Sequence, residues 1–255
     1  YRQGPFRPGG TGVRFGVPGV TPVVKTLMIV CGVIWFVEFG LYLVLARSPE
    51  QVRTFWDIIR IFGLVPEKVV ESLYLWQPFT YMFLHHPQEI FNVLLNMLML
   101  WMFGGELERH WGSNGFLRYY MVCGIGAGLL AIPFGYLVGT QQAVTIGASG
   151  AVFGLFVAYG MVFAERPVLF MLIFPMKART MSLIMFGMVL FYTVTQPRGP
   201  VSHIAHLGGA VVGVLYLKRV WRFGEFYRDI KWRINRRRFK VIPKDDKNDF
   251  DRWVN

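Results

Sequence analysis

The feature that most constrains this chain is a series of apolar stretches long enough, or nearly long enough, to cross a bilayer. They occupy residues 24–46, 88–107, 116–138, 146–164, 181–195 and 201–217. About 20 apolar helical residues cover the roughly 30 Å hydrocarbon core of a membrane. Hydrophobic residues make up 54% of the sequence, and its mean hydropathy is +0.40. We therefore predict an all-α membrane protein with six transmembrane helices.

The segments outside these stretches define three expected regions. Residues 1–22, rich in Gly, Pro and Arg, should be a flexible basic arm, residues 23–217 a membrane domain, and residues 218–255 a basic cytoplasmic tail. Residues 47–86 mix charges of both signs with aromatic side chains, which is typical of short amphipathic helices at the membrane interface. Residues 168–174 are expected to dip into the membrane before Pro175.

The distribution of charge indicates how the chain is oriented. The formal net charge of +12 is concentrated in the two ends and in the connections that follow spans two and four. Cytoplasmic loops carry such Lys and Arg excesses, so both termini should be cytoplasmic and nucleic acid is not an expected partner. We expect a multi-pass protein of the bacterial inner (plasma) membrane. Spans two, four and six must then begin at the same depth, near the outer face.

The basic tail has two interpretations. Between Trp221 and Arg238 its aromatic residues alternate with cations, a composition suited to the surface of an anionic lipid leaflet. A tail that is simply solvated is the alternative, and the sequence leaves both open.

Residue types exclude several chemistries. Cys31 and Cys123 are the only cysteines, and both lie in apolar stretches, so neither a disulfide framework nor a cysteine metal site is expected. No His-Glu-x-x-His motif is present, and every Asp lies outside the predicted spans. We therefore expect no metal and no cofactor.

Polar side chains that hydrocarbon tolerates poorly occur near the expected outer ends of spans two, four and six. They are Asn92, Asn96, Ser149, His203 and His206. A buried polar group without a partner costs several kcal/mol in hydrocarbon, so such residues are candidates for function. Because their three helices begin at one depth, we expect these side chains to converge.

A serine, a histidine and amide donors together are the minimal apparatus for acyl transfer. The serine oxygen attacks, the imidazole carries the proton, and the donors stabilise the oxyanion. Gly147 and Gly150 permit close approach to Ser149, and a helix N-terminus there adds free N–H groups. No carboxylate lies within spans two, four or six apart from their ends, so a Ser-His dyad is predicted.

Each of these residues also has a structural interpretation. Small residues such as Gly209-x-x-x-Gly213 pack membrane helices, and a Gly-Ala-Ser-Gly turn taken alone is more typical of packing than of catalysis. The two asparagines alone would be interhelical hydrogen bonders, and a single histidine can be structural. Transport is a further alternative, although the spans show no inverted repeat and no central carboxylate.

Five motifs, taken together, resemble those of the rhomboid family of intramembrane serine proteases. They are Trp76-Gln77-Pro78-Phe79-Thr80-Tyr81-Met82-Phe83-Leu84-His85, Phe91-Asn92 through Asn96, Phe103-Gly104-Gly105-Glu106-Leu107-Glu108, Gly147-Ala148-Ser149-Gly150, and Ala205-His206-Leu207-Gly208-Gly209 continuing to Gly213. The resemblance implies a six-helix bundle with an interfacial loop between helices one and two. It implies hydrolysis of a peptide bond in or near a transmembrane segment of another membrane protein, without metal or nucleotide. It also suggests that residues 185–191 gate substrate entry.

The resemblance also assigns roles to residues. Ser149 would be the nucleophile and His206 the general base. Asn96, Asn92 and Gly147, with the Ser149 N–H, would form the oxyanion hole, and Phe153 would stack on the base. The alternative is a non-catalytic rhomboid-like protein that binds membrane clients, against which the intact serine and histidine argue.

Three positions depart from the pattern of many family members. Asn92 replaces a histidine, but an amide can still donate a hydrogen bond, so we expect altered efficiency rather than loss. Phe153 replaces a tyrosine and retains the stacking surface. Gln77 replaces an arginine, which leaves an Arg-dependent loop network without its cation.

Overall fold

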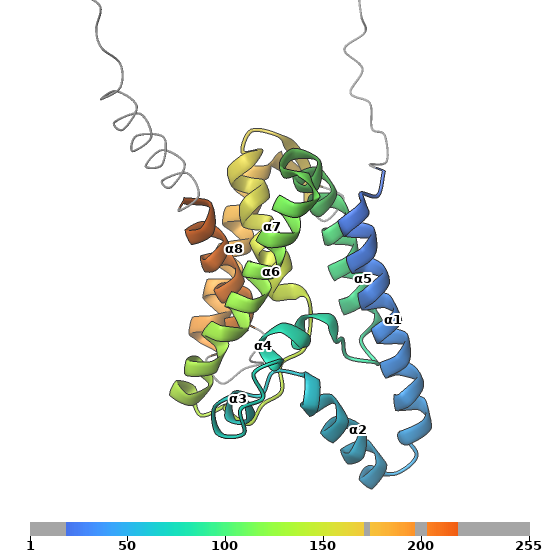
Figure 1. Ribbon diagram of the computed structural model, residues 1–255. Coiled ribbons are helices and arrows are strands. Elements are labelled where there is room, and N and C mark those ends of the chain that lie inside the picture. The colour runs from blue at the N-terminus through green and yellow to red at the C-terminus, as the bar shows by residue number, and fades with distance from the viewer. Residues whose placement is uncertain (1–18, 171–173, 197–202, 219–255) are drawn as a thin grey trace, which may run out of the picture. The chain divides into compact units, whose positions relative to one another are not determined.

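The computed structural model describes residues 19–170, 174–196 and 203–218 and is mostly helical (Figure 1). The predicted arm and tail fall almost entirely outside these residues. The chain divides into two compact units, Tyr1–Val214 and Leu215–Asn255, and only the end of one helix is described in the second. The arrangement discussed below is that of the first unit.

The elements follow one another in a simple order. In sequence they are α1 (Pro22–Leu45), α2 (Pro49–Phe62), α3 (Pro66–Glu71), α4 (Gln77–Thr80), the 3₁₀ turn η1 (Tyr81–Phe83), α5 (Ile90–Met99), the π-helical η2 (Leu100–Gly104), α6 (Gly105–Val138), α7 (Ser149–Val162), β1 (Pro167–Phe170), β2 (Phe174–Lys177) and α8 (Ala178–Thr195). A last helix, His203–Lys218, follows. Each predicted span therefore coincides with a helix.

Among the described residues, three helical stretches are long and apolar enough to cross a membrane. These are Pro22–Leu45, Ile90–Val138 and Ala178–Thr195. The second covers two predicted spans and bends at Gly112, whose φ of 73° and ψ of 162° are not helical. A left-handed φ is cheap only for glycine, so this residue allows the chain to turn between the two spans.

The two remaining apolar helices, α7 and the last helix, are shorter. Helix α7 has 14 residues and is therefore roughly 21 Å long, less than the thickness of the hydrocarbon core. Its first residue is Ser149. The number of complete membrane crossings accordingly remains a prediction.

The segment expected to dip into the membrane before Pro175 includes two paired strands, and its depth in the membrane remains a prediction. Residues 167–170 and 174–177 form an antiparallel hairpin in which Pro167 pairs with Lys177 and Phe170 pairs with Phe174. The backbone N–H and C=O groups of each strand form hydrogen bonds with those of the other strand. Lys177 Nζ forms an ion pair with Glu165 Oε2 at 2.7 Å.

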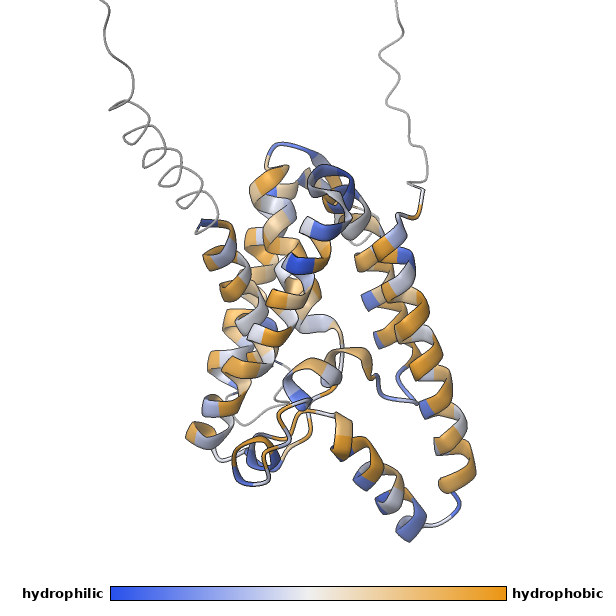
Figure 2. Cartoon of the chain, viewed as in Figure 1, coloured by the Kyte–Doolittle hydropathy of each residue, from blue (hydrophilic) through white to orange (hydrophobic). Residues whose placement is uncertain are grey.

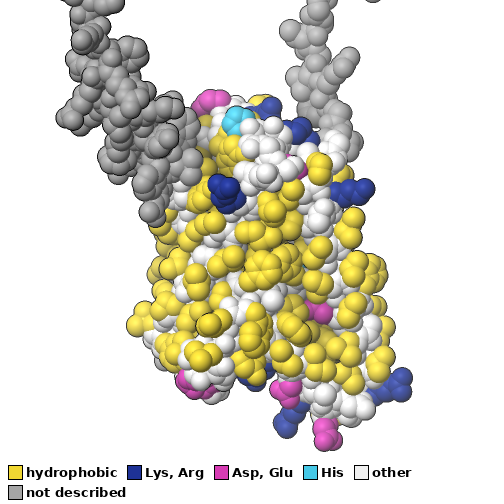
Figure 3. All heavy atoms as spheres, in the orientation of Figure 1, with side chains coloured by type: hydrophobic (Ala, Val, Ile, Leu, Met, Phe, Trp, Pro, Cys, Tyr) yellow, Lys and Arg dark blue, Asp and Glu magenta, His cyan; other side chains and the backbone are white. Residues whose placement is uncertain are grey.

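The described surface matches a bilayer environment. Hydrophobic residues line α1, α5, α6 and α8 (Figure 2). On the face shown in Figure 3 hydrophobic side chains cover the middle, and most charged side chains lie toward the two ends. Phe36 on α1 and Val194 on α8 are each 68% exposed. A water-soluble domain rarely exposes so much contiguous apolar surface, so this is an integral membrane protein.

A buried carboxylate anchors the start of α1. Glu108 is 3% exposed and accepts hydrogen bonds from the hydroxyls of Thr21 and Ser113 and from the backbone N–H groups of Val23 and Val24. The first N–H groups of a helix have no partner within the helix, and a negative charge there is favourable. Glu108 therefore ties α1 to α6 across more than 80 residues of sequence.

The region between α1 and α5 contains short helices, as the amphipathic pattern predicts. Ser48 caps α2 by accepting from the Gln51 N–H at 3.3 Å. Phe55 and Ile59 bury the apolar face of α2 against Leu84 and the end of α1. The position of these helices at the membrane interface remains a prediction.

Candidate active site

The turn before Ser149 is held by backbone contacts to the α1–α5 region. Gly147 has a φ of +126°, and its N–H donates to the Tyr81 carbonyl at 2.9 Å. Leu64 and Thr145 exchange two backbone hydrogen bonds of 2.9 and 2.8 Å. A side chain would be strained at the φ of Gly147, so glycine is required for this turn. Ser149 follows as the first residue of α7.

Ser149 and His206 lie within hydrogen-bond distance of each other. Ser149 Oγ and His206 Nε2 are 2.6 Å apart, although 57 residues separate them in sequence. With the ring neutral and its proton on Nδ1, the serine hydroxyl donates to Nε2, which is the arrangement that general-base chemistry needs. The two residues predicted as a dyad are therefore neighbours in space.

An aromatic ring supports the imidazole. The rings of Phe153 and His206 are stacked, with centroids 4.6 Å apart and planes at 26°. Phe153 is one helical turn after Ser149, so both side chains lie on the same face of α7. The ring of Phe153 thus lies against that of His206, and its role in catalysis remains a prediction.

Glycine brings the two helices together. A Cβ atom on Gly209 would lie only 1.9 Å from the carbonyl oxygen of Gly150, and one on Gly213 would lie 3.3 Å from Gly154 Cα. Only glycine at position 209 allows the backbones to approach this closely. The packing interpretation and the catalytic interpretation are thus complementary, because the close contact of Gly150 and Gly209 brings His206 near Ser149.

The two asparagines of α5 bond to each other. Asn96 is 6% exposed, and its Nδ2 donates to the Oδ1 and carbonyl oxygen of Asn92 at 2.8 and 3.0 Å. Asn92 is exposed and donates to Glu89 at 3.3 Å. Helix α5, which carries both asparagines, contacts α7, the helix that begins with Ser149. The N–H of Gly147, in contrast, is already used by Tyr81.

Tyr81 is a supporting residue that the sequence analysis did not single out. Its carbonyl accepts from Gly147, and its hydroxyl donates to the Gly124 carbonyl at 2.7 Å. The hydroxyl also lies 3.2 Å from the position that a Cβ on Gly150 would occupy. The only sequence signal for this role was its place in the motif that begins at Trp76.

Gln77 forms a neutral network at the position where an arginine is common. It is fully buried, its Oε1 accepts from the Val65 N–H at 2.9 Å, and its Nε2 donates to the Arg60 carbonyl at 2.8 Å. A planar amide can therefore join the end of α2 to the start of α4 without a cation.

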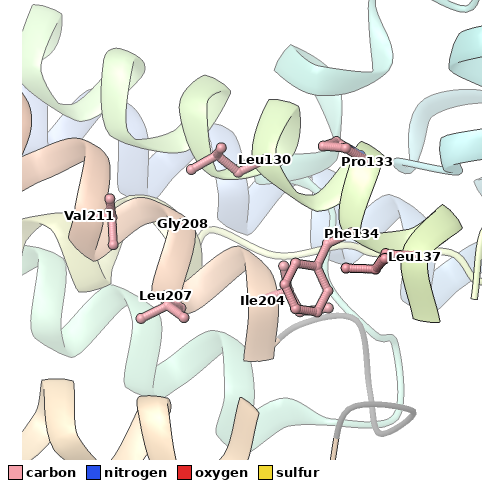
Figure 4. A pocket seen from close by; sticks show the side chains of 8 residues that line it. All are labelled: Leu130, Pro133, Phe134, Leu137, Ile204, Leu207, Gly208 and Val211. Carbon is pink, nitrogen blue, oxygen red and sulfur yellow. The ribbon is translucent and has the colours of Figure 1, made fainter. Parts of the chain in front are cut away.

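An apolar cavity lies apart from these polar residues. It has a volume of about 460 Å³ and lies between α6 and the last helix (Figure 4). Ile204, Leu207, Gly208 and Val211 contribute one wall, on a different face of the helix from His206. Its almost wholly apolar lining offers no group for acyl transfer. Among the described residues, no group of three His, Cys, Asp or Glu side chains is placed to hold a metal ion.

Comparison with known proteins gives a consistent family. Residues 72–223 match the model of the rhomboid domain. The chain is 32% identical over 212 residues to Rhomboid-like protein 11, chloroplastic, of Arabidopsis thaliana, and 30% identical over 133 residues to Rhomboid protein 1, mitochondrial, of Saccharomyces cerevisiae. It is also 32% identical over 147 residues to RHOMBOID-like protein 1 of Arabidopsis thaliana.

These alignments cover 76%, 51% and 58% of this chain. They cover 66%, 38% and 35% of the respective relatives, so the chain spans less than two thirds of the length of each. The matched domain includes the turn at Ser149, His206 and the glycines that pack their helices. Because the model of the rhomboid domain matches more than half of its length, this chain belongs to the rhomboid family.

Proposed function

We propose that this protein is an intramembrane serine endopeptidase that cleaves a peptide bond in or near a transmembrane segment of other membrane proteins. The observation that carries the proposal is the 2.6 Å separation of Ser149 Oγ and His206 Nε2. Membership of the rhomboid family supports the same reaction class.

The geometry suits a two-step acyl transfer. Ser149 Oγ attacks the scissile carbonyl carbon while His206 Nε2 takes the hydroxyl proton, and the protonated imidazole then gives that proton to the leaving amine. Water, deprotonated by the same imidazole, releases the acyl group and restores Ser149. Phe153 holds the ring face, which limits the orientations that His206 adopts. The reaction needs no metal or nucleotide.

Oxyanion stabilisation is assigned to α5 and to the start of α7. The N–H of Ser149 belongs to the first turn of a helix and has no partner within that helix. The Nδ2 group of Asn96 donates to two acceptors on Asn92, and exchanging one of them for a substrate oxyanion would complete the hole. Asn92 would assist by orienting Asn96, and Gly147 by shaping the turn.

The short length of α7 supports chemistry below a membrane surface. A helix of roughly 21 Å that reaches one face of the bilayer begins inside the hydrocarbon region at its other end. Ser149 would therefore be submerged, which suits cleavage of a transmembrane segment and requires a path for water.

The cellular setting is also a proposal. The Lys and Arg distribution favours cytoplasmic N- and C-termini in a bacterial-type plasma membrane, with a membrane domain over residues 23–217. Transmembrane substrates are the expected partners, and anionic lipids are expected at the basic tail. The tail lies outside the described residues.

The decisive experiment compares three proteins in liposomes with a generic single-span substrate. The parent should cleave it, whereas Ser149→Ala and His206→Ala should lose essentially all cleavage, because each removes one member of the dyad. His110→Ala, which removes an exposed histidine, is the matched control and should cleave at the parental rate.

A fluorophosphonate probe separates the remaining outcomes. Persistent cleavage by both dyad variants would refute the assignment of Ser149 and His206. If no protein cleaves but the parent is labelled at Ser149, the enzyme has a narrow specificity. If the parent is neither active nor labelled, the non-catalytic client-binding alternative holds.

A further inference from the structure

His203, one turn before His206, connects the last helix to α8. The rings of Tyr192 and His203 are stacked, with centroids 5.6 Å apart and planes at 18°. The hydroxyl of the adjacent Thr193 donates to the His203 carbonyl at 3.3 Å and to the Val189 carbonyl at 2.8 Å. Two consecutive residues of α8 therefore hold both the side chain and the backbone of His203.

The same histidine contacts the proposed general base. The rings of His203 and His206 meet edge to face, with centroids 6.3 Å apart and planes at 69°. On its other side His206 stacks on Phe153. Phe153, His206, His203 and Tyr192 thus form a continuous row of four rings that crosses from α7, through the last helix, to α8. We call this set the ring row.

The ring row constrains a motion that backbone packing leaves free. The contact between Gly150 and Gly209 fixes the distance between α7 and the last helix, and it needs no side chain at position 203. Stacking on Phe153 restrains tilting of the imidazole out of its plane, but the imidazole can still slide parallel to the Phe153 ring. His203 blocks that movement at one edge, since its own ring is held by Tyr192.

The C-terminal half of α8 is only partly buried in the part of the chain that the structure describes. Its buried residues are Ala178, Met181, Val189 and Thr193, whereas Phe191 and Val194 are strongly exposed. Near its start, α8 packs on α7, where a Cβ on Gly160 would overlap the Ser182 side chain. In the C-terminal half of α8, Tyr192 and Thr193 both contact His203 on the helix of the base.

We propose that His203 is a positioning residue which, together with Tyr192, couples α8 to His206, so that outward movement of α8 releases the imidazole from its reactive orientation. The inference rests on the proposed function and deepens it. Closure of α8 over a bound substrate would then assemble the reactive geometry, and an open α8 would leave Ser149 without an aligned base.

The test measures cleavage and fluorophosphonate labelling of variants of the full chain. His203→Ala and Tyr192→Ala remove rings from the row, and on the order of a tenfold fall in kcat is expected for each, with KM little changed. Labelling by the small probe should slow in parallel, since it needs the base but not the entry of a transmembrane segment. His203→Phe and Tyr192→Phe keep the rings and should recover most of both rates.

Val194→Ala is the matched control, because it truncates an exposed residue two positions from Tyr192 on the same helix. It should cleave and be labelled as the parent is. The double variant His203→Ala/Tyr192→Ala should be no slower than either single variant, because all three break one connection. The same non-additivity is expected in unfolding temperatures, a readout that requires no activity.

The outcomes separate this inference from the proposed function. Parental labelling of His203→Ala would overturn the positioning role while leaving the dyad intact. Faster cleavage by Tyr192→Ala with unchanged labelling would show that α8 acts only on substrate entry. Equal labelling of the parent and Ser149→Ala would instead refute the proposed function. Strictly additive effects of the two alanine substitutions on unfolding would still count against the ring row.

Discussion

Replacing Gly209 with alanine tests whether one backbone contact sets the geometry of the candidate site. The new Cβ would lie 1.9 Å from the Gly150 carbonyl oxygen and 2.7 Å from the carbonyl carbon. Both atoms belong to the backbone of α7, so neither can rotate away. A carbon and a carbonyl oxygen approach no closer than about 3.3 Å, so the two helices must separate locally by roughly 1.4 Å.

The consequence for catalysis follows from the position of the contact. Gly150 follows Ser149 directly, and Gly209 is three residues from His206, so the displacement acts almost at the dyad. If it is transmitted fully, the 2.6 Å separation between Ser149 Oγ and His206 Nε2 grows to roughly 4 Å, beyond hydrogen-bond reach. Misplacement of about 1 Å can lower a rate about 100-fold, and overpacking costs about 1–3 kcal/mol of stability.

The assay is cleavage of a single-span substrate in liposomes, with thermal unfolding of each protein in detergent measured alongside. Gly187→Ala on α8 is the matched control, because an added Cβ there meets nothing within 4 Å. It should retain the parental rate and stability or gain slightly from the better helix propensity of alanine. A folded Gly209→Ala protein that cleaves and unfolds like the parent would refute the reasoning, since it would show that the helices adjust without moving the dyad.

Three further predictions concern stability. Glu108→Gln should lower the free energy of unfolding by about 2–4 kcal/mol, because it removes the charge that four donors share. Glu50→Gln, which changes an exposed residue at the start of α2, should alter this free energy little, and equal unfolding curves for the two variants would contradict the anchoring role. Gln77→Leu should cost about 1–3 kcal/mol in a chemical unfolding titration, because the buried N–H of Val65 loses its acceptor, and a neutral effect would argue that the loop rearranges. Burial lowers the pKa of His85, in the loop between η1 and α5, to about 4, so the unfolded chain binds this proton more tightly than the folded chain does. As the pH drops from about 6.5 towards 4, the parent should therefore lose up to roughly 3 kcal/mol of unfolding free energy relative to His85→Asn; parallel pH profiles of the two proteins would contradict this.

The sequence by itself determined which segments are helical and which polar residues are candidates. Lipid requires every backbone group of a span to be satisfied within its own helix, so apolar length predicts helices well. The same constraint made Ser149, His206 and Asn96 conspicuous, because polar groups inside a span need a specific partner or a function. The family resemblance then assigned roles that composition alone left open.

The tertiary structure decided what the side chains contact. That Gly209 lies against Gly150 depends on two helices 59 residues apart in sequence, and no local pattern encodes which glycines will meet. Glu108 was visible as a charge at the end of a span and as the last residue of the motif that begins at Phe103, but neither pattern indicated that its donors come partly from the start of α1. The pairing of residues 167–170 with 174–177 was missed because strand pairing depends on a partner segment, whereas helix formation is local.

The contacts of His203 illustrate the same limit. In the sequence it is one of two histidines on nearly one helix face. The resemblance already paired Phe153 with His206, whereas only the position of α8 reveals that Tyr192 stacks on His203. Sequence therefore determined the chemistry available to this protein, because residue types and apolar length act locally. Tertiary packing decided which of those groups meet, because the approach of helices depends on side-chain volumes at positions far apart in the chain.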